Sequence, residues 1–298
     1  MNTQNKKKWI LVDGHNLAFR CFYGVPDMTR SDGLHVNAIY GFIRTLMKLN
    51  STYTPDAICV FFDTDGSKVR KHELSTYKAN RKKMPVELVE QIQILPSLVI
   101  SMGYYVDQHS GIEADDLIGM YAKKIANEDE IAYIASADKD FAQCISKNVF
   151  QLLPPVSKSK TSNWKLLDHN GVIEKYGLRP DQMVDYLALI GDSADNIDGI
   201  PGVGPKTATK WLKELGTIES IYDNITKISP IRFQDILLAN KELVYRNQRL
   251  ITLQEYNDFN LPSAEHKPDM LAFEKQLQEI GLFSIAREIR KENQRELF

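Results

Sequence analysis

An apolar run near the start of the chain ends in an acidic turn, Trp9-Ile10-Leu11-Val12-Asp13-Gly14-His15-Asn16. Two later apolar runs also lead into an aspartate: Ala57 to Phe62 precedes Asp63, and Ile131 to Ala137 precedes Asp138. Each run has the composition of a buried β-strand. In an open parallel α/β sheet, ligands bind outside the carboxyl ends of the strands. The pattern therefore predicts three carboxylates at one sheet edge, although they lie about 50 to 75 residues apart in the chain.

Amphipathic stretches alternate with these strands at residues 38–49, 86–102 and 114–126. Such alternation is typical of βαβ units, so we expect an α/β fold with a mostly parallel central sheet flanked by helices. Beyond about Pro180 the pattern is mostly helical, and it includes the stretches 241–245 and 269–291. We expect an α/β core over residues 1–180 and a second, mostly helical region over 181–298. This boundary is soft, because acidic residues beyond it are needed to complete the site of the core.

Nine carboxylates form the candidate metal site: Asp13, Asp63, Glu113, Asp115, Asp116, Asp138, Asp140, Asp192 and Asp195. A single aspartate at a strand end is explained by its preference for turns and helix caps. That explanation fails for the set, since Glu113, Asp115 and Asp116 lie within one helical turn, where like charges repel. Oxygen ligands without His or Cys favour Mg²⁺ or Mn²⁺, and two such ions about 4 Å apart can hydrolyse a phosphodiester. The sequence predicts a two-metal site for phosphoryl transfer to water.

The charge distribution favours a nucleic-acid partner although the net charge is only −2. With the nine carboxylates set aside, 30 acidic residues face 37 Lys and Arg, a surplus of seven positive charges. A basic stripe follows the Asp63 strand and consists of Lys68, Arg70, Lys71, Lys78, Arg81, Lys82 and Lys83. A run of this kind is either the solvated face of a surface helix or a phosphate-binding stripe. Its position beside the proposed metals favours substrate binding.

The cysteines and the hydropathy indicate a cytoplasmic protein without a membrane partner. Cys21, Cys59 and Cys144 show no metal-binding spacing, which suggests reduced thiols. No apolar run reaches the ~18 residues needed to span a bilayer, and the basic N-terminus is not followed by the apolar core of a signal peptide.

A glycine-rich turn marks the helical region: Gly199-Ile200-Pro201-Gly202-Val203-Gly204-Pro205-Lys206-Thr207-Ala208. Glycines permit a tight turn whose backbone N–H groups can approach a phosphate. Lys206, Lys210 and Lys213 then recur on one helical face. The pattern predicts a helix-hairpin-helix clamp for nucleic acid. A nucleotide P-loop requires GxxxxGK[ST] after a strand. Pro205 breaks that spacing, and no strand is predicted before the turn.

Six motifs occur together in one order: Asp13-Gly14-His15-Asn16-Leu17-Ala18-Phe19-Arg20, Phe61-Phe62-Asp63, Tyr77-Lys78-Ala79-Asn80-Arg81, Gly111-Ile112-Glu113-Ala114-Asp115-Asp116, Ala137-Asp138-Lys139-Asp140, and Gly191-Asp192 through Ala208. In these motifs the chain resembles the 5'-nuclease (flap endonuclease) family, especially the bacterial and phage 5'-3' exonucleases homologous to the N-terminal nuclease domain of DNA polymerase I. The resemblance implies a PIN-like, resolvase-like core, a helical arch at about residues 66–95 and a helix-three-turn-helix. It also implies cleavage of DNA with a 5' flap, nick, gap or free 5' end, or of an RNA primer on DNA, without an obligatory protein partner.

The resemblance also implies roles for individual residues. The first metal would be bound by Asp63, Glu113, Asp115 and Asp116, with Asp13 in or beside its inner shell, and the second by Asp138, Asp140, Asp192 and Asp195. Lys78 and Arg81 would contact the scissile phosphate, and Tyr77 would stack on a base unless it packs in the core. Further DNA contacts are expected from Arg20, Arg70, Lys82, Lys83, Gly199, Gly202, Gly204, Lys206, Thr207 and Lys210. The hairpin turn can host a K⁺ ion in this family.

One departure from the family pattern, one expectation about the extent of the chain and two alternatives accompany this interpretation. Asp198 stands where many relatives carry proline, which places an extra negative charge near the predicted clamp. The chain ends at Phe298, so a stand-alone paralogue without a polymerase is expected. A non-catalytic, structure-specific DNA-binding protein would not need all nine carboxylates. A PIN-like ribonuclease would need neither the hairpin nor the long second part.

Overall fold

A six-stranded sheet forms the centre of the computed structural model, which describes residues 6–155, 163–256, 260–262 and 267–296. The strand order is β3-β2-β1-β4-β5-β6; the first five strands are parallel and β6 is antiparallel to β5. The strands are β1 (Lys8–Asp13), β2 (Ala57–Phe61), β3 (Tyr105–Asp107), β4 (Ile131–Ala135), β5 (Val149–Leu153) and β6 (Lys165–Leu167). The α/β fold with a mostly parallel central sheet is confirmed. The strands β3, β5 and β6 were not predicted.

Helices cover both faces of this sheet. Successive residues of a strand point to opposite faces, and the strands are apolar on both, so each face packs against helices. In β1, Ile10 and Val12 pack against one layer of helices, whereas Trp9 and Leu11 pack against the other. The first layer consists of α1 (Gly14–Gly24), α2 (Asn37–Tyr53) and α4 (Val86–Ser101), and the second contains α5 (Ala114–Asn127). The predicted helices at 38–49, 86–102 and 114–126 are confirmed within a few residues.

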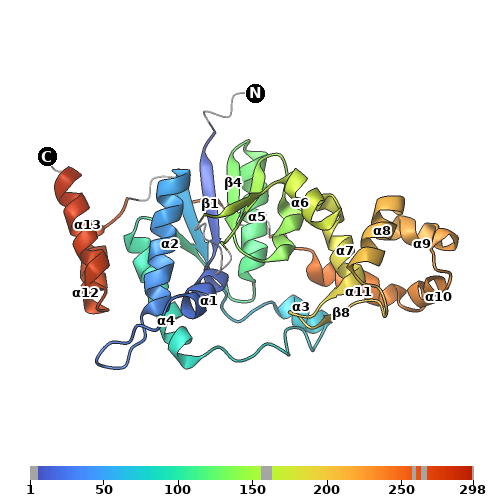
Figure 1. Cartoon of the computed structure of the whole chain (residues 1–298), viewed down its shortest axis with the longest axis horizontal. Coiled ribbons are helices and arrows are strands. Elements are labelled where there is room, and N and C mark those ends of the chain that lie inside the picture. Colours follow the sequence, from blue (N-terminus) through green and yellow to red (C-terminus); the bar gives the residue numbers. More distant parts are fainter. Residues whose placement is uncertain (1–5, 156–162, 257–259, 263–266, 297–298) are drawn as a thin grey trace.

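Two C-terminal helices extend the first layer at one end of the molecule (Figure 1). They are α12 (Met270–Glu279) and α13 (Phe283–Glu296). The stretch 269–291 predicts continuous helix, but the structure divides it at Gly281, whose φ of +81° lies in the left-handed region.

A separate hydrophobic core lies in the mostly helical region that follows the sheet. Its elements are α6 (His169–Tyr176), η3 (Pro180–Gln182), α7 (Met183–Ile190), β7 (Gly191–Asp192), β8 (Ile197–Asp198), α8 (Pro205–Leu215), α9 (Ile218–Asp223), η4 (Ile225–Lys227), α10 (Arg232–Ala239) and α11 (Lys241–Ile251). Figure 1 shows α8, α9 and α10 at the end of the molecule opposite α12 and α13. Within the described ranges, none of the helices combines the length and the apolar character needed to cross a bilayer.

The segment predicted as a helical arch is helical only at its ends. It begins with α3 (Lys68–Glu73), continues through turns and extended backbone over residues 74–85, and then enters α4. Its middle is held against the β7–β8 turn: the Lys78 N–H donates to the Asp195 carbonyl at 3.0 Å, and the Asn80 amide donates to the Ser193 carbonyl at 2.6 Å. In the opposite direction, the side-chain amide of Asn196 in the β7–β8 turn donates to the Thr76 carbonyl at 2.8 Å.

Candidate metal centre and nucleic-acid interface

Three strand ends bring three carboxylates to one edge of the sheet. Strands β2, β1 and β4 are neighbours, with Asp13 paired to Phe61 and Val12 paired to Ala135. Asp13 caps α1, its Oδ1 accepting from the Asn16 N–H at 3.0 Å, and its Oδ2 accepts from the Ser136 hydroxyl at 3.0 Å. The juxtaposition of Asp13, Asp63 and Asp138 predicted from the sequence is thus present, since Asp13 is within electrostatic reach of both others.

The N-terminus of α5 adds two more carboxylates to this edge. Asp63 Oδ1 accepts from the Ala114 N–H at 2.7 Å and so fixes the start of α5 beside β2. Asp115 then lies among Asp13, Asp138 and Asp63, whose negative charges all act on it. Glu113, the residue before the helix, is 3 % exposed and faces the segment between α3 and α4.

A second acidic group forms where the 3₁₀ helix η2 (Lys139–Cys144) meets the β7–β8 turn. Asp138 caps η2, accepting from the Asp140 N–H at 2.9 Å. Asp140, Asp192 and Asp195 each offer one carboxylate oxygen, and these oxygens lie within 4.8 Å of one another. Oxygens this close suit a divalent cation. The sequence distance between Asp140 and Asp192 is bridged because α7 packs against η2 and leads directly into β7.

The electrostatics of this edge favour the binding of cations. Burial, followed by repulsion from Asp63 and Asp138, raises the pKa of Asp13 to about 7. Burial and neighbouring carboxylates likewise hold the pKa values of Asp115 and Asp140 well above the usual range. Asp140 Oδ1 is buried and has no hydrogen-bond partner. Buried polar oxygens are normally paired, so an unpaired carboxylate oxygen among like charges fits a metal ligand.

Basic side chains face the carboxylates from two directions. The Lys78 ammonium lies 2.8 Å from Glu113 Oε1 and 3.9 Å from Asp195 Oδ2, and Arg81 Nη2 lies 2.5 Å from Asp195 Oδ1. Lys139, which the sequence argument did not single out, lies 3.0 Å from Asp192 Oδ1. Burial raises the pKa of Glu113, but attraction to Lys78 and Arg70 outweighs burial and leaves that pKa below its ordinary value. Lys78 and Arg81 therefore lie against the carboxylates, and their contact with the scissile phosphate stays a prediction.

Three of the predicted roles do not match the structure. Arg70 is 3 % exposed and is bound to Asp116 and Glu113, so it cannot reach a substrate phosphate without breaking buried ion pairs. Asp116 is fully buried, and both of its oxygens accept hydrogen bonds from Arg70, which leaves no access for a metal ion. Tyr77 packs in the core of the helical region and donates its hydroxyl to Glu113 or Asp195, both at 3.1 Å, so base stacking is excluded in this arrangement.

The remaining predicted DNA contacts lie at the surface. Arg20, Lys82, Lys83, Lys206 and Lys210 are exposed, and Thr207 is half-buried. The lysines of α8 line a groove with two aromatic side chains and one further lysine that sequence reasoning missed: Lys175, Tyr176, Tyr186, Lys206, Lys210 and Lys213. Lys175 lies in the last turn of α6, and only the packing of α6 near α8 reveals its place in the groove.

The hairpin glycines serve different purposes. Gly204 precedes α8, and a side chain there would meet open space, which suits a close approach of phosphate to the helix N-terminus. Gly202 has a φ of +77°, so the turn itself requires glycine. Gly199 is different, because a Cβ at this position would lie 2.2 Å from the Ile190 carbonyl carbon. Its absence of a side chain lets β8 pass the end of α7. Asp198 is exposed beside this turn.

Comparison with known proteins identifies the family. A profile described as "5'-3' exonuclease, N-terminal resolvase-like domain" matches residues 8–177, and one described as "5'-3' exonuclease, C-terminal SAM fold" matches residues 178–275. The chain belongs to the 5'-3' exonuclease family. The family and the hydrolase class predicted from the motifs are thereby confirmed.

Individual relatives agree with this assignment. A 5'-3' exonuclease of Aquifex aeolicus is 33 % identical over 301 residues, covering 98 % of this chain and 100 % of that protein. DNA polymerase I of Caldicellulosiruptor bescii is 37 % identical over 247 residues, covering 83 % of this chain but only 29 % of the polymerase. The flap endonuclease of bacteriophage T5, solved as a complex with DNA and metal ions, has the same fold, with a TM-score of 0.69, 20 % identity, and coverage of 96 % of this chain and 97 % of the phage protein.

Proposed function

We propose that this 5'-3' exonuclease family member is a structure-specific nuclease that uses Mg²⁺ or Mn²⁺ to hydrolyse DNA phosphodiesters at 5' flaps, nicks, gaps or free 5' ends. The observation that carries the proposal is the gathering of eight of the nine predicted carboxylates, all except Asp116, at one edge of the sheet, where Lys78 and Arg81 face them. Acidic residues alone would repel a phosphate, so the site works only with cations.

The residues present fit two divalent ions. Asp140, Asp192 and Asp195, with Asp138 beside them, would hold one ion, because their oxygens already converge. Asp63, Glu113 and Asp115, with Asp13, would hold the other. Divalent ions bound there would supply an activated water and offset charge on the phosphate. We propose Mg²⁺ or Mn²⁺ as the ions at the carboxylates, and a K⁺ ion at the hairpin turn.

Lys78 and Arg81 would bind the phosphate itself. Both are engaged with Glu113 and Asp195 in the present arrangement. Once those carboxylates bind cations, the ammonium and guanidinium groups are available to the scissile phosphate. Arg suits bidentate phosphate contact, whereas Lys acts as a point charge. The groove along α8 would hold the duplex through Lys206, Lys210 and Lys213.

The test uses 5'-labelled flap, nicked, blunt and single-stranded DNA, and an RNA strand of matched length, each with Mg²⁺ or with EDTA. Metal-dependent cutting at the flap junction is expected. Asp192→Asn should remove cutting while flap binding persists. Tight flap binding without cutting in Mg²⁺ or Mn²⁺ would favour a DNA-binding protein instead, and preferential cutting of the RNA strand would favour a PIN-like ribonuclease.

A further inference from the structure

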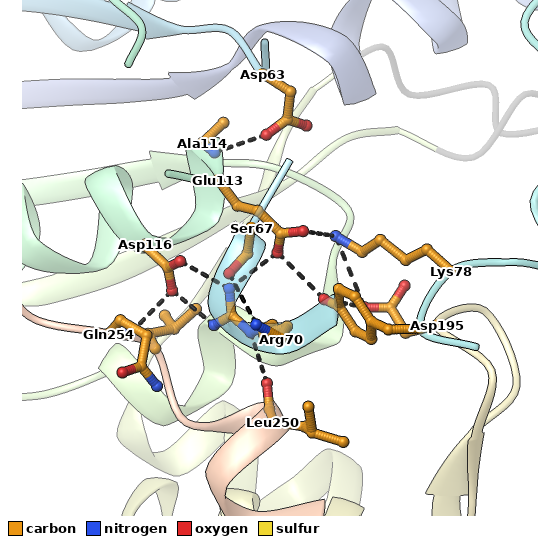
Figure 2. A network of polar contacts seen from close by, with 12 residues as sticks. Asp63, Ser67, Arg70, Lys78, Glu113, Ala114, Asp116, Asp195, Leu250 and Gln254 are labelled. Carbon is orange, nitrogen blue, oxygen red and sulfur yellow. Dashed lines mark hydrogen bonds and ion pairs between the residues drawn. The ribbon is translucent and has the colours of Figure 1, made fainter. Parts of the chain in front are cut away.

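Arg70 is a buried cation whose surroundings exclude direct contact with substrate but connect it to the metal centre. It lies on α3, where the Ser67 hydroxyl oxygen accepts from its backbone N–H at 3.1 Å and caps the helix. Ser67 has no exposed surface, and Arg70 has 3 %. The guanidinium thus points away from solvent and into the space between α3, α5 and the end of α11 (Figure 2).

Every N–H donor of the Arg70 guanidinium has a partner. Nε donates to the Leu250 carbonyl at 2.8 Å. Nη1 donates to Glu113 Oε2 at 2.9 Å and to Asp116 Oδ2 at 2.7 Å. Nη2 donates to Asp116 Oδ1 at 2.6 Å and to the Thr252 carbonyl at 3.2 Å. A guanidinium has five N–H donors in a fixed fork, and no other side chain could satisfy this set of acceptors.

The two carboxylates bound by Arg70 differ in whether an oxygen remains available to a metal ion. Asp116 is fully buried and also accepts from the Gln254 N–H at 2.8 Å, so it serves as a fixed counter-ion. Glu113 accepts from Arg70 and Tyr77 through Oε2 alone. Its Oε1 contacts only the Lys78 ammonium among the interactions described for it. Arg70 thereby fixes one oxygen of Glu113 and leaves the other directed at a cation.

We propose that Arg70 is a positioning residue that orients Glu113 for the metal ion bound beside α5 and ties this site to α11 of the helical region. The proposal rests on the function proposed above. Buried partners that orient a ligand typically change metal affinity by about 10- to 100-fold when they are removed. Arg70 should therefore act on the ion near Glu113, and leave the ion near Asp140, Asp192 and Asp195 unaffected.

The experiment measures Mn²⁺ binding to the full chain by isothermal titration calorimetry, alongside thermal unfolding. In Arg70→Lys the charge remains but the fork is lost, and we expect one Mn²⁺ dissociation constant to rise by about 10-fold or more while the other stays within about twofold. Arg249→Lys is the matched control, since Arg249 joins α11 to α3 through Glu73 but touches none of the site carboxylates. It should leave both constants unchanged.

The double variant Arg70→Gln with Asp116→Asn separates positioning from folding. It removes both charges of the buried pair and is expected to recover most of the unfolding temperature, because no uncompensated charge remains buried. One weakened Mn²⁺ site in this folded variant supports the proposal. Two wild-type Mn²⁺ sites in either folded variant, or equal weakening of both sites, would overturn it and leave Arg70 as a structural ion pair. Failure of the wild-type chain to bind Mn²⁺ would instead contradict the proposed function.

Discussion

Asp140 is a carboxylate whose surroundings disfavour its negative charge when no cation is bound. Its Oδ1 is buried and has no hydrogen-bond partner, and desolvation together with repulsion from Asp138, Asp192 and Asp195 holds its pKa well above the usual range. A carboxyl with a raised pKa in the folded state binds more protons there than in the unfolded chain. Its contribution to stability therefore falls as pH rises from the ordinary carboxyl pKa through the raised one.

Asp140→Asn should accordingly stabilise the metal-free chain and inactivate it. With EDTA at pH 8 we expect the unfolding temperature to rise by a few degrees, since a neutral amide removes the repulsion. The gain should shrink at pH 5, where the wild-type carboxyl is more protonated. With Mg²⁺ the flap cleavage rate should fall at least about 100-fold. Thermal unfolding at both pH values and single-turnover cleavage check this, and an unaltered cleavage rate would remove Asp140 from the site.

Lys78 is expected to act on the chemical step more than on binding. Its ammonium lies against Glu113 and Asp195, and its side chain is only 15 % exposed. Lys78→Ala should lower the single-turnover cleavage rate at least about 100-fold, while the flap dissociation constant changes only a few-fold. Lys83→Ala is the control, because Lys83 is exposed; it should weaken binding without lowering the saturated rate. If Lys78→Ala weakened binding but left the cleavage rate unchanged, Lys78 would not contact the scissile phosphate during cleavage.

Much of the site follows from residue patterns, and the exceptions have a physical cause. Asp13, Asp63 and Asp138 could be placed together because strand ends of a parallel sheet share an edge. Arg70 and Tyr77 could not be placed, because a basic, aromatic run is compatible with either a solvated or a buried face. Arg70 turns inward only because its acceptors arrive from α5 and from residues 250 and 252, far along the chain.

Helix α8 is the element predicted to bind duplex DNA, because its N-terminus and the lysines on one of its faces can both contact phosphates. Lys206 and Lys210 are exposed on the groove that also contains Lys175. Each phosphate contact contributes about −0.9 to the slope of log K against log salt concentration. The double variant Lys206→Ala, Lys210→Ala should therefore reduce the magnitude of that slope by about 2 for a blunt duplex. Titrations between 50 and 200 mM KCl measure it, and an unchanged slope would show that duplex DNA binds on another surface.

At the scale of the whole molecule, the candidate metal centre lies where the two large parts of the chain meet. Asp13, Asp63 and Asp138 come from the sheet, whereas Asp192 and Asp195 come from the β7–β8 turn of the helical region. The contacts of the α3–α4 segment and of Arg70 cross the same junction. A cation bound by both parts would therefore stabilise their union in addition to serving the chemistry.

Mg²⁺ should consequently raise the unfolding temperature of the full chain. A ligand that binds only the folded state stabilises it by RT ln(1 + [L]/Kd), about 2.7 kcal/mol at 100 times Kd. We expect a saturable increase with Mg²⁺ that EDTA reverses, measured by scanning calorimetry at constant ionic strength. The double variant Asp140→Asn, Asp192→Asn should start from a higher metal-free unfolding temperature and gain less from Mg²⁺, because neutral amides replace two of the three converging carboxylates. An equal gain in both proteins would mean that the stabilising ion binds outside this cluster.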